Sequence, residues 1–164
     1  MQRGYSLLNI LLVDHKKDTI MKSGHCNIVY STASYTTTGR TDIIDITHEA
    51  DDVVRSSGVT DGNLLLFISG STAALTTIEY ESGVVNDLKK AVERVAPRDI
   101  EYEHDRRWGD GNGYSHVRAA LLGASLHIPI KNGRMLLGTW QQIVLLDFDN
   151  RPRRREVQIQ IMGI

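Results

Sequence analysis

The stretch from Tyr102 to His116, YEHDRRWGDGNGYSH, gathers side chains that can bind a metal ion into one polar segment. The candidate donors are two imidazoles and several oxygen ligands, on His104, Asp105, Asp110, Asn112 and His116. Imidazole nitrogens and carboxylate oxygens are donors that zinc and other divalent cations accept in proteins. Three interspersed glycines allow the backbone to bend tightly. The segment predicts either a divalent metal site or a surface loop whose polar side chains only cap the following helix.

Further candidates lie outside this segment. Glu79 follows an apolar, strand-like run, where it can act as a metal ligand or general base, or simply face water at a strand end. Ser71 and Thr72 can offer hydroxyl and backbone N–H groups to an anion, or form a bend between strands. The run Arg153–Arg155 can hold a phosphate, although neighbouring residues on a strand point to opposite faces.

Length, composition and charge limit the protein class. The chain has 164 residues, 41% of them hydrophobic, with 19 Lys and Arg against 20 Asp and Glu. This suits one globular domain and excludes a disordered chain, a fibre and a (β/α)₈ barrel, which needs about 250 residues. The net charge of −1 argues against a nucleic-acid partner, whereas the mildly basic C-terminal half suits a small anionic ligand. No apolar run approaches the ~20 residues of a membrane span, so we expect a cytoplasmic protein.

Apolar spacing predicts two main helices. The first covers residues 47–57, with Thr47 placed to cap it and Gly58 to stop it. The second begins at Ser82, and its apolar residues recur at helical spacing as far as Val95. A polar loop and a short third helix follow, over residues 98–113 and 115–122.

Strands account for most of the remaining chain. They are predicted over residues 27–37, 41–46, 64–68, 72–79, 125–130, 134–138, 139–148 and 154–162. Asn132-Gly133 is the strongest short hairpin signal, and Asp61-Gly62 and Asp149–Pro152 predict further turns. The fold class is therefore α+β, with a mostly antiparallel, sandwich-like sheet core and two main helices. Residues 25–164 read as one domain, and residues 1–24 as an N-terminal extension, either disordered or upstream of a start at Met21.

Several long motifs, in the same order, resemble the YjbQ family, whose members are often labelled secondary thiamine-phosphate synthase enzymes. The motifs are GSTAALTTIEYE (70–81), YEHDRRWGDGNGYSHVRAALLG (102–123), NGRMLLGTWQQIVLLDFD (132–149) and the RPRRREV that follows, with GRTDIIDIT (39–47) upstream. The resemblance implies a compact α+β fold, a homotrimer, and a site where the strand of Glu79 meets the His104–His116 loop across a subunit boundary.

The resemblance also implies roles for individual residues. It makes His104, His116 and Asp105 metal ligands, Glu79, Asp110 and Asn112 catalytic residues, and Ser71, Thr72, Ser115 and Arg118 phosphate or substrate ligands. Many relatives carry a histidine where this chain has Gly70, and some carry another at Tyr114. A site built on three histidines therefore does not carry over, and a carboxylate and water would complete the metal's ligands here.

Three functions remain open from the sequence. The first is a transferase, assisted by zinc or magnesium, that joins hydroxymethylpyrimidine diphosphate to hydroxyethylthiazole phosphate and expels diphosphate. The second is a metal-dependent hydrolase in which Glu79 or Asp110 activates a bound water. The third is a non-catalytic trimer that binds a small anionic metabolite. In each, the expected ligand is a small anionic or phosphorylated metabolite, with neither nucleic acid nor a membrane involved.

Overall fold

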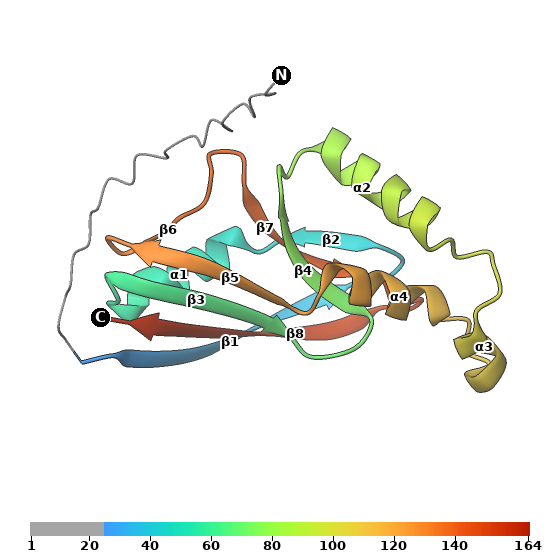
Figure 1. Ribbon diagram of the computed structural model, residues 1–164, viewed down its shortest axis with the longest axis horizontal. Coiled ribbons are helices and arrows are strands. Elements are labelled where there is room, and N and C mark those ends of the chain that lie inside the picture. The colour runs from blue at the N-terminus through green and yellow to red at the C-terminus, as the bar shows by residue number, and fades with distance from the viewer. Residues whose placement is uncertain (1–24) are drawn as a thin grey trace, which may run out of the picture.

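A computed structural model describes residues 25–164, in which two antiparallel sheets pack together with four helices (Figure 1). The five-stranded sheet has the order β1 (Asn27–Thr37), β8 (Arg153–Gly163), β3 (Asp61–Ile68), β5 (Ser125–Lys131) and β6 (Arg134–Met135). The three-stranded sheet has the order β2 (Asp42–Asp45), β7 (Gln142–Asp147) and β4 (Ala73–Ile78). The helices are α1 (Thr47–Ser57), α2 (Ser82–Val95), α3 (Glu103–Trp108) and α4 (Gly113–Leu122). The predicted α+β class with a sandwich-like core is confirmed.

The main core lies between the two sheets and beneath α1. It receives Leu64 and Leu66 from β3, Ile159 from β8 and Leu145 from β7, together with Val54 of α1. Strand β7 is buried along its whole length from Ile143, because its other face meets a second cluster. A strand covered on both faces loses the alternation of polar and apolar residues, which explains the continuous run IVLL.

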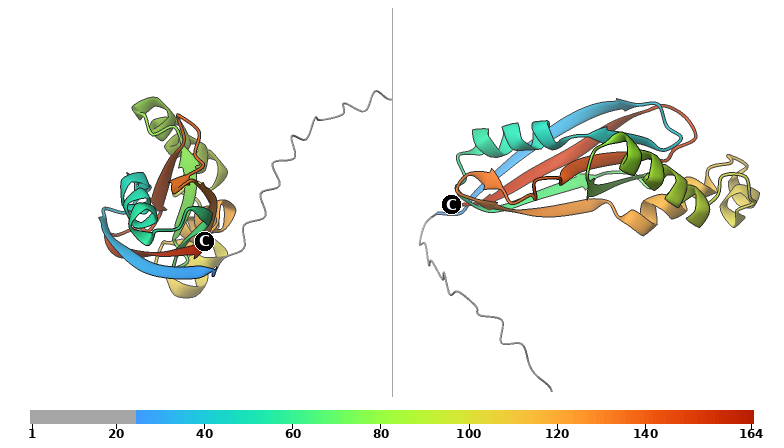
Figure 2. Two further views of the ribbon diagram at one scale, coloured as in Figure 1. Left: turned by 90° about the vertical axis from the view of Figure 1, so that its left-hand side faces the viewer. Right: turned by 90° about the horizontal axis from the view of Figure 1, so that it is seen from above.

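Helices α2 and α4 cover the second face of the three-stranded sheet. Val92 of α2 and Ala119 of α4 pack there against Leu146 and Phe148. Val92 is the one buried residue of α2, and Val95 at the end of the helix is 67% exposed. The views in Figure 2 show an elongated molecule in which α3 and the first turn of α4 lie at one end and the C-terminus at the other. No helix in residues 25–164 is long and apolar enough to cross a membrane.

The predicted polar loop over residues 98–113 contains a short helix, α3, that the sequence analysis missed. Its charged side chains pair along the surface, where Arg106 binds both Glu101 and Glu103. Gly109, with a φ of 68°, ends the helix in the left-handed conformation that glycine favours. Helix α3 has no buried residue, so it lacks the apolar stripe that reveals a helix in a sequence.

Two predicted local features are wrong in detail. Asp61-Gly62 forms no turn but begins β3, where a Cβ on Gly62 would lie 2.2 Å from the carbonyl oxygen of Met162. Glycine is therefore needed for close strand approach rather than for a bend. Helix α2 is capped not by Ser82 but by Glu81, whose carboxylate accepts from two backbone N–H groups of the first turn.

Helix α1 has no side-chain cap, contrary to the role expected of Thr47. Its hydroxyl instead donates to Asp45 and accepts from the backbone N–H of Ile143 at 2.8 Å, so it joins α1 to β7. The Asn132-Gly133 hairpin is confirmed, because both residues have positive φ, 52° and 71°, as a tight two-residue turn requires. The prediction that residues 1–24 form an extension lies outside the described residues.

Candidate functional site

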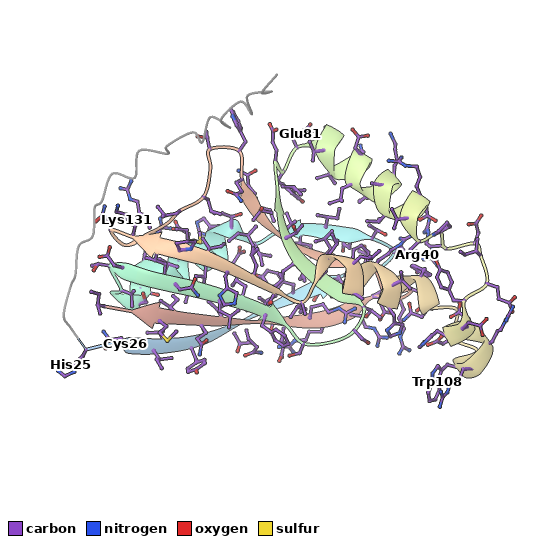
Figure 3. The ribbon with its side chains drawn as sticks, in the orientation of Figure 1. His25, Cys26, Arg40, Glu81, Trp108 and Lys131 are labelled. Carbon is purple, nitrogen blue, oxygen red and sulfur yellow. The ribbon has the colours of Figure 1, made fainter. Side chains whose placement is uncertain are left out.

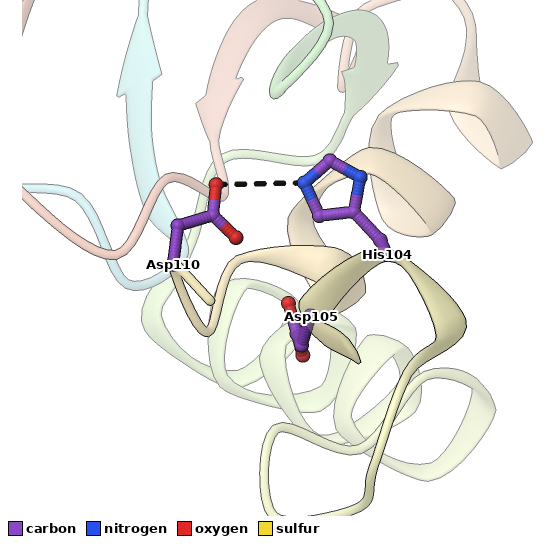
Figure 4. Close-up of side chains that lie close together, drawn as sticks. All are labelled: His104, Asp105 and Asp110. Carbon is purple, nitrogen blue, oxygen red and sulfur yellow. Dashed lines mark hydrogen bonds and ion pairs between the residues drawn. The ribbon is translucent and has the colours of Figure 1, made fainter. Parts of the chain in front are cut away.

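The polar segment predicted to bind metal brings His104, Asp105 and Asp110 together where α3 meets α4. Nε2 of His104 lies 3.4 Å from Oδ2 of Asp110, and one ligand atom from each of the three residues lies within 4.8 Å of the others. Figure 4 shows His104 and Asp110 facing one another, with Asp105 beside them. His116 of α4 adds a second imidazole, whose ring centroid is 4.3 Å from that of His104.

Backbone contacts between α3 and α4 hold these side chains in place. Oδ1 of Asp105 accepts from the N–H of Gly113 at 2.8 Å, which ties α3 to the start of α4. A Cβ on Gly113 would lie 2.4 Å from Cβ of Tyr102, so only glycine permits this close approach. Oδ1 of Asp110 accepts from the N–H of Asn112 at 3.3 Å and braces the connecting turn. The cluster is therefore set by the fold and not by long, freely moving side chains.

The donor set fits a divalent cation, and one pair of ligand atoms has the spacing that a bound ion requires. Two ligand atoms bound tetrahedrally at 2.0–2.1 Å lie about 3.3 Å apart. The 3.4 Å separation between His104 and Asp110 matches this value. Their side chains are 30% and 46% exposed, so an ion can enter from solvent. Two imidazoles favour zinc over magnesium, which prefers oxygen ligands.

A hollow of about 370 Å³ lies beside His116. Ser71 contributes a hydroxyl to it, and small residues such as Gly70, Ala73 and Ala120 form much of the remaining lining. Because these side chains are so short, the space next to the imidazole stays open to a ligand. Ser71 is thus the one predicted phosphate ligand that the structure brings to an open position near the histidines.

Arg118, in contrast, is 1% exposed and fully engaged inside the protein. Its guanidinium donates to the carbonyl oxygen of Ala96, to Oγ1 of Thr41 at 2.9 Å and to Glu93 at 2.7 Å. It also lies over the ring of Tyr114, 4.8 Å from the centroid. These contacts support a structural role for Arg118, joining α4 to α2 and to the start of β2.

Asn112, Ser115 and Thr72 are also buried, within hydrogen bonds that position neighbouring segments. The Ser115 hydroxyl lies 2.6 Å from Oδ1 of Asn112 and 2.5 Å from the carbonyl oxygen of Phe148. Oγ1 of Thr72 donates to Asp149 and accepts from Arg155. Asn112 and Ser115 therefore fix the start of α4 against the end of β7, close to the histidines but without facing solvent.

Glu79 does not join the cluster within one chain. The start of β4, at Ala73, lies beside the hollow near His116, and the strand runs away from it to Ile78. Six residues of extended strand span about 20 Å. Figure 3 shows Glu81, two residues further along, at the upper edge of the molecule, where α2 begins. Glu79 is exposed there, where it can reach another chain.

Sequence reasoning missed a buried charge network that joins the two sheets. Asp147 and Asp149, at the end of β7, are both fully buried and bind Arg155 and Arg153 of β8. Burial raises the pKa of Asp149, but hydrogen bonds from Arg153 and Thr72 outweigh this effect and hold that pKa below its usual value. The sequence RPRRRE did contain a signal for this network, because Arg153 and Arg155 are two positions apart on a strand and therefore point to the same face.

A larger hollow, of about 740 Å³, lies elsewhere, between α1 and the segment that joins β6 to β7. Its formal charges balance, with Asp45 and Asp51 against Arg55 and Arg134, and Arg55 binds Asp51 directly. Among residues 25–164, it holds no cluster of metal ligands like that at the α3–α4 junction. We therefore take the α3–α4 junction as the candidate functional site.

The fold and this site define a small α+β protein with a histidine- and carboxylate-rich candidate metal centre at one end. The chain belongs to the YjbQ family, since the model described as UPF0047 protein YjbQ-like matches residues 31–164. The UPF0047 protein of Methanothermobacter thermautotrophicus is 39% identical over 127 residues, covering 77% of this chain and 87% of that protein. YugU of Bacillus subtilis is 38% identical, covering 77% and 94%.

Solved structures show the same fold. A YbjQ-like protein of unknown function from Sulfolobus solfataricus superimposes with a TM-score of 0.81 at 28% identity, covering 85% of this chain and 100% of that one. An uncharacterised member of the family from Clostridium acetobutylicum gives a TM-score of 0.73 at 35% identity, covering 80% and 98%. The family assignment made from the motifs is confirmed.

Proposed function

We propose that this protein binds a divalent cation at the α3–α4 junction and uses it to act on a small phosphorylated metabolite. The observation that carries the proposal is the convergence of His104, Asp105 and Asp110 within 4.8 Å, with His116 in ring contact. His104, His116 and one or both aspartates would hold the ion. Bound there, it would neutralise negative charge on a leaving group.

The reaction that we propose, following the family resemblance, is thiamine phosphate synthesis. The thiazole ring nitrogen forms a bond to the exocyclic methylene carbon of the pyrimidine, and the carbon–oxygen bond to diphosphate breaks. Diphosphate leaves with the electron pair. The hollow beside His116 would orient the substrates, and the Ser71 hydroxyl would donate to a phosphate oxygen. Asn112 would act as a positioning residue, since its amide oxygen is engaged by Ser115 and Asn150.

A homotrimer would explain how Glu79 contributes to the proposed reaction. Because β4 carries it about 20 Å from the hollow beside His116, Glu79 would serve the metal centre of a neighbouring copy. Mixing Glu79→Gln chains with His104→Ala/His116→Ala chains then tests the arrangement. Mixed assemblies contain some intact sites, so we expect activity to reappear when two inactive variants are combined.

The experiment that tests the proposal measures metal content per chain by plasma mass spectrometry, and formation of thiamine phosphate from the two precursors. We expect stoichiometric metal in the wild type and none in the His104→Ala/His116→Ala variant. His127→Ala is the matched control, because this exposed histidine lies on β5 and bonds Asn63. It should keep both metal and activity.

Two results would contradict the proposal. Absence of metal after loading would make the histidines hydrogen-bonding residues only. Metal without thiamine phosphate would reject the transferase, and turnover of phosphate esters would then favour a hydrolase. The exposed Asp110 next to His104 is placed to activate water in such an enzyme. Saturable binding without any turnover would favour a metabolite-binding protein.

A further inference from the structure

A second hollow, between α2 and the turn that joins β1 to β2, has a strongly basic lining. Arg40, Lys89, Lys90, Arg98 and one carboxylate, Glu93, surround a space of about 260 Å³. Their formal charge is +3. Figure 3 shows Arg40 beside the C-terminal end of α2. Three separate segments therefore direct cationic side chains toward one small space.

Most of this charge is not neutralised by the protein. Among residues 25–164, Arg40 and Lys89 form no ion pair with a carboxylate. Lys90 lies 3.6 Å from Asp87, but both side chains are well exposed, and such pairs contribute little. Clustered like charges repel one another, so the hollow is electrostatically suited to an anion.

The one carboxylate in the lining is already engaged. Glu93 accepts from Nε of Arg98 at 3.0 Å and from the buried Arg118 at 2.7 Å. Burial raises the pKa of Glu93, but the backbone N–H of Arg98 and the Arg118 guanidinium outweigh it and hold that pKa below its usual value. Glu93 therefore orients Arg98 and does not neutralise Arg40 or Lys89.

The backbone that presents Arg40 has an uncommon conformation. Gly39, Arg40 and Thr41 have φ values of 74°, 56° and 70°, and positive φ is rare for a β-branched residue such as Thr41. Backbone N–H groups of Arg40 and Thr41 donate to the carbonyl oxygens of Asp149 and Asp147, which holds this conformation. The position of Arg40 at the hollow is thus built into the fold.

We propose that this basic hollow binds the phosphate or diphosphate group of a small metabolite. Guanidinium and ammonium groups are suited to phosphate oxygens, and the lining offers donors with no unengaged carboxylate. The volume lies below the roughly 300–1,000 Å³ of sites that enclose a whole drug-sized ligand. The hollow therefore recognises a charged group and not an entire molecule. A long polyanion would need a basic surface that extends beyond these four side chains.

This hollow is distinct from the candidate metal centre. Arg118 lies behind it, bound to Thr41 and Glu93, whereas His116 faces the metal cluster. The two residues are two positions apart on α4, which places them about 200° apart around the helix. Helix α4 therefore separates the two sites, and each can be tested without the other.

Anion binding would also stabilise α2, which has Val92 as its one buried residue and packs otherwise through the partly buried Val85 and Leu88. Binding would bridge Lys89 of this helix to Arg40 of the β1–β2 turn and reduce the repulsion between them. A ligand that binds only the folded state raises its stability by mass action. The site therefore predicts a higher melting temperature in the presence of diphosphate.

Isothermal titration calorimetry with sodium diphosphate and sodium phosphate tests the proposal. The informative variant is Arg40→Asn/Lys89→Gln, because asparagine tolerates positive φ and glutamine suits an exposed helix position. With metal-free protein throughout, we expect saturable binding of one anion per chain, weakened about tenfold or more in this variant through the loss of two charged donors. Arg94→Gln is the control, since Arg94 is an exposed cation of α2 that does not line the hollow.

A parallel titration of the His104→Ala/His116→Ala variant separates the two sites, and its affinity should equal that of the wild type. Loss of binding in that variant would place the anion at the metal centre and overturn the proposal. Equal affinity in Arg40→Asn/Lys89→Gln and the wild type would also overturn it. So would binding of a heparin fragment in the absence of any diphosphate or phosphate binding. Diphosphate binding tighter than phosphate binding would identify a two-phosphate group as the ligand.

Discussion

The imidazole rings of His104 and His116 lie with their centroids 4.3 Å apart and are tilted by 42°, although they project from different helices. This contact brings together the two ends of the polar segment. Asp105 and Asp110 lie beside His104, so a cation placed there would meet nitrogen and oxygen donors together. All four residues come from the one polar segment, residues 102–116.

We expect zinc to raise the melting temperature of the wild type but to have a much smaller effect on His116→Ala. A ligand at about 100 times its Kd adds about 2.7 kcal/mol to the free energy of unfolding. Losing one imidazole ligand should weaken zinc binding at least about tenfold. The metal-free variant should melt close to metal-free wild type, because His116 lies on an open hollow and not in a hydrophobic core.

Differential scanning fluorimetry with and without zinc measures both effects, with His127→Ala as the control. An equal zinc shift in wild type and His116→Ala would show that this imidazole is not a ligand. A large fall in the melting temperature of the metal-free variant would show that His116 is structural.

Arg118 gives a second prediction, about stability. It is 1% exposed, and its planar guanidinium donates to three different acceptors, including Ala96 and Thr41. Lysine keeps the charge but cannot reach these acceptors together. We expect Arg118→Lys to lower the free energy of unfolding by about 3 kcal/mol, since breaking a buried charge network leaves polar groups unpaired.

Urea denaturation at neutral pH measures this loss. Arg154→Lys is the matched control, because Arg154 is exposed on β8. The free energy of unfolding of this variant should lie within about 0.5 kcal/mol of wild type. A loss below about 1 kcal/mol for Arg118→Lys would contradict the structural role that these contacts assign to the arginine.

The elements with local signals were predictable from the sequence. Asn132-Gly133 fixed one hairpin because its two positive φ values belong to a two-residue turn. Helix α3 was not predicted, because its six residues include no buried side chain and so show no helical spacing of apolar residues. The link at Asp149–Pro152 looks like a simple turn, yet β7 and β8 belong to different sheets. Which sheet a strand joins depends on contacts far along the chain.

The candidate site, too, was predictable from the sequence in one part and not in another. His104, Asp105 and Asp110 are close in sequence, so their clustering could be predicted from one glycine-rich segment. The burial of Arg118 could not, because an arginine in a short helix ordinarily faces water. Its partners Thr41 and Glu93 lie 77 and 25 residues away. A buried polar residue of this kind can be identified only once the fold shows which distant residues bind it.

The third prediction concerns acid stability and Asp149. Its carboxylate is 1% exposed and accepts from Arg153 at 2.8 Å and Thr72 at 2.9 Å. These bonds hold its pKa in the folded state below the ordinary value of 3.8, against the effect of burial. The unfolded chain therefore takes up a proton first as the pH falls. The stabilisation by Asp149 is complete above about pH 4 and is lost as the pH falls through the lower, folded-state pKa.

Urea denaturation of wild type and Asp149→Asn between pH 7 and pH 3 tests this prediction. The variant cannot ionise at this position, so it should be less stable than wild type at neutral pH, with a difference that shrinks below pH 4. Asp99→Asn is the control, because Asp99 is exposed after α2. Its free energy of unfolding should change with pH as that of wild type does. If the gap between wild type and Asp149→Asn instead stayed constant with pH, the charge on Asp149 would not stabilise the fold. The buried link between β7 and β8 would then depend on Asp147 and Arg155 alone.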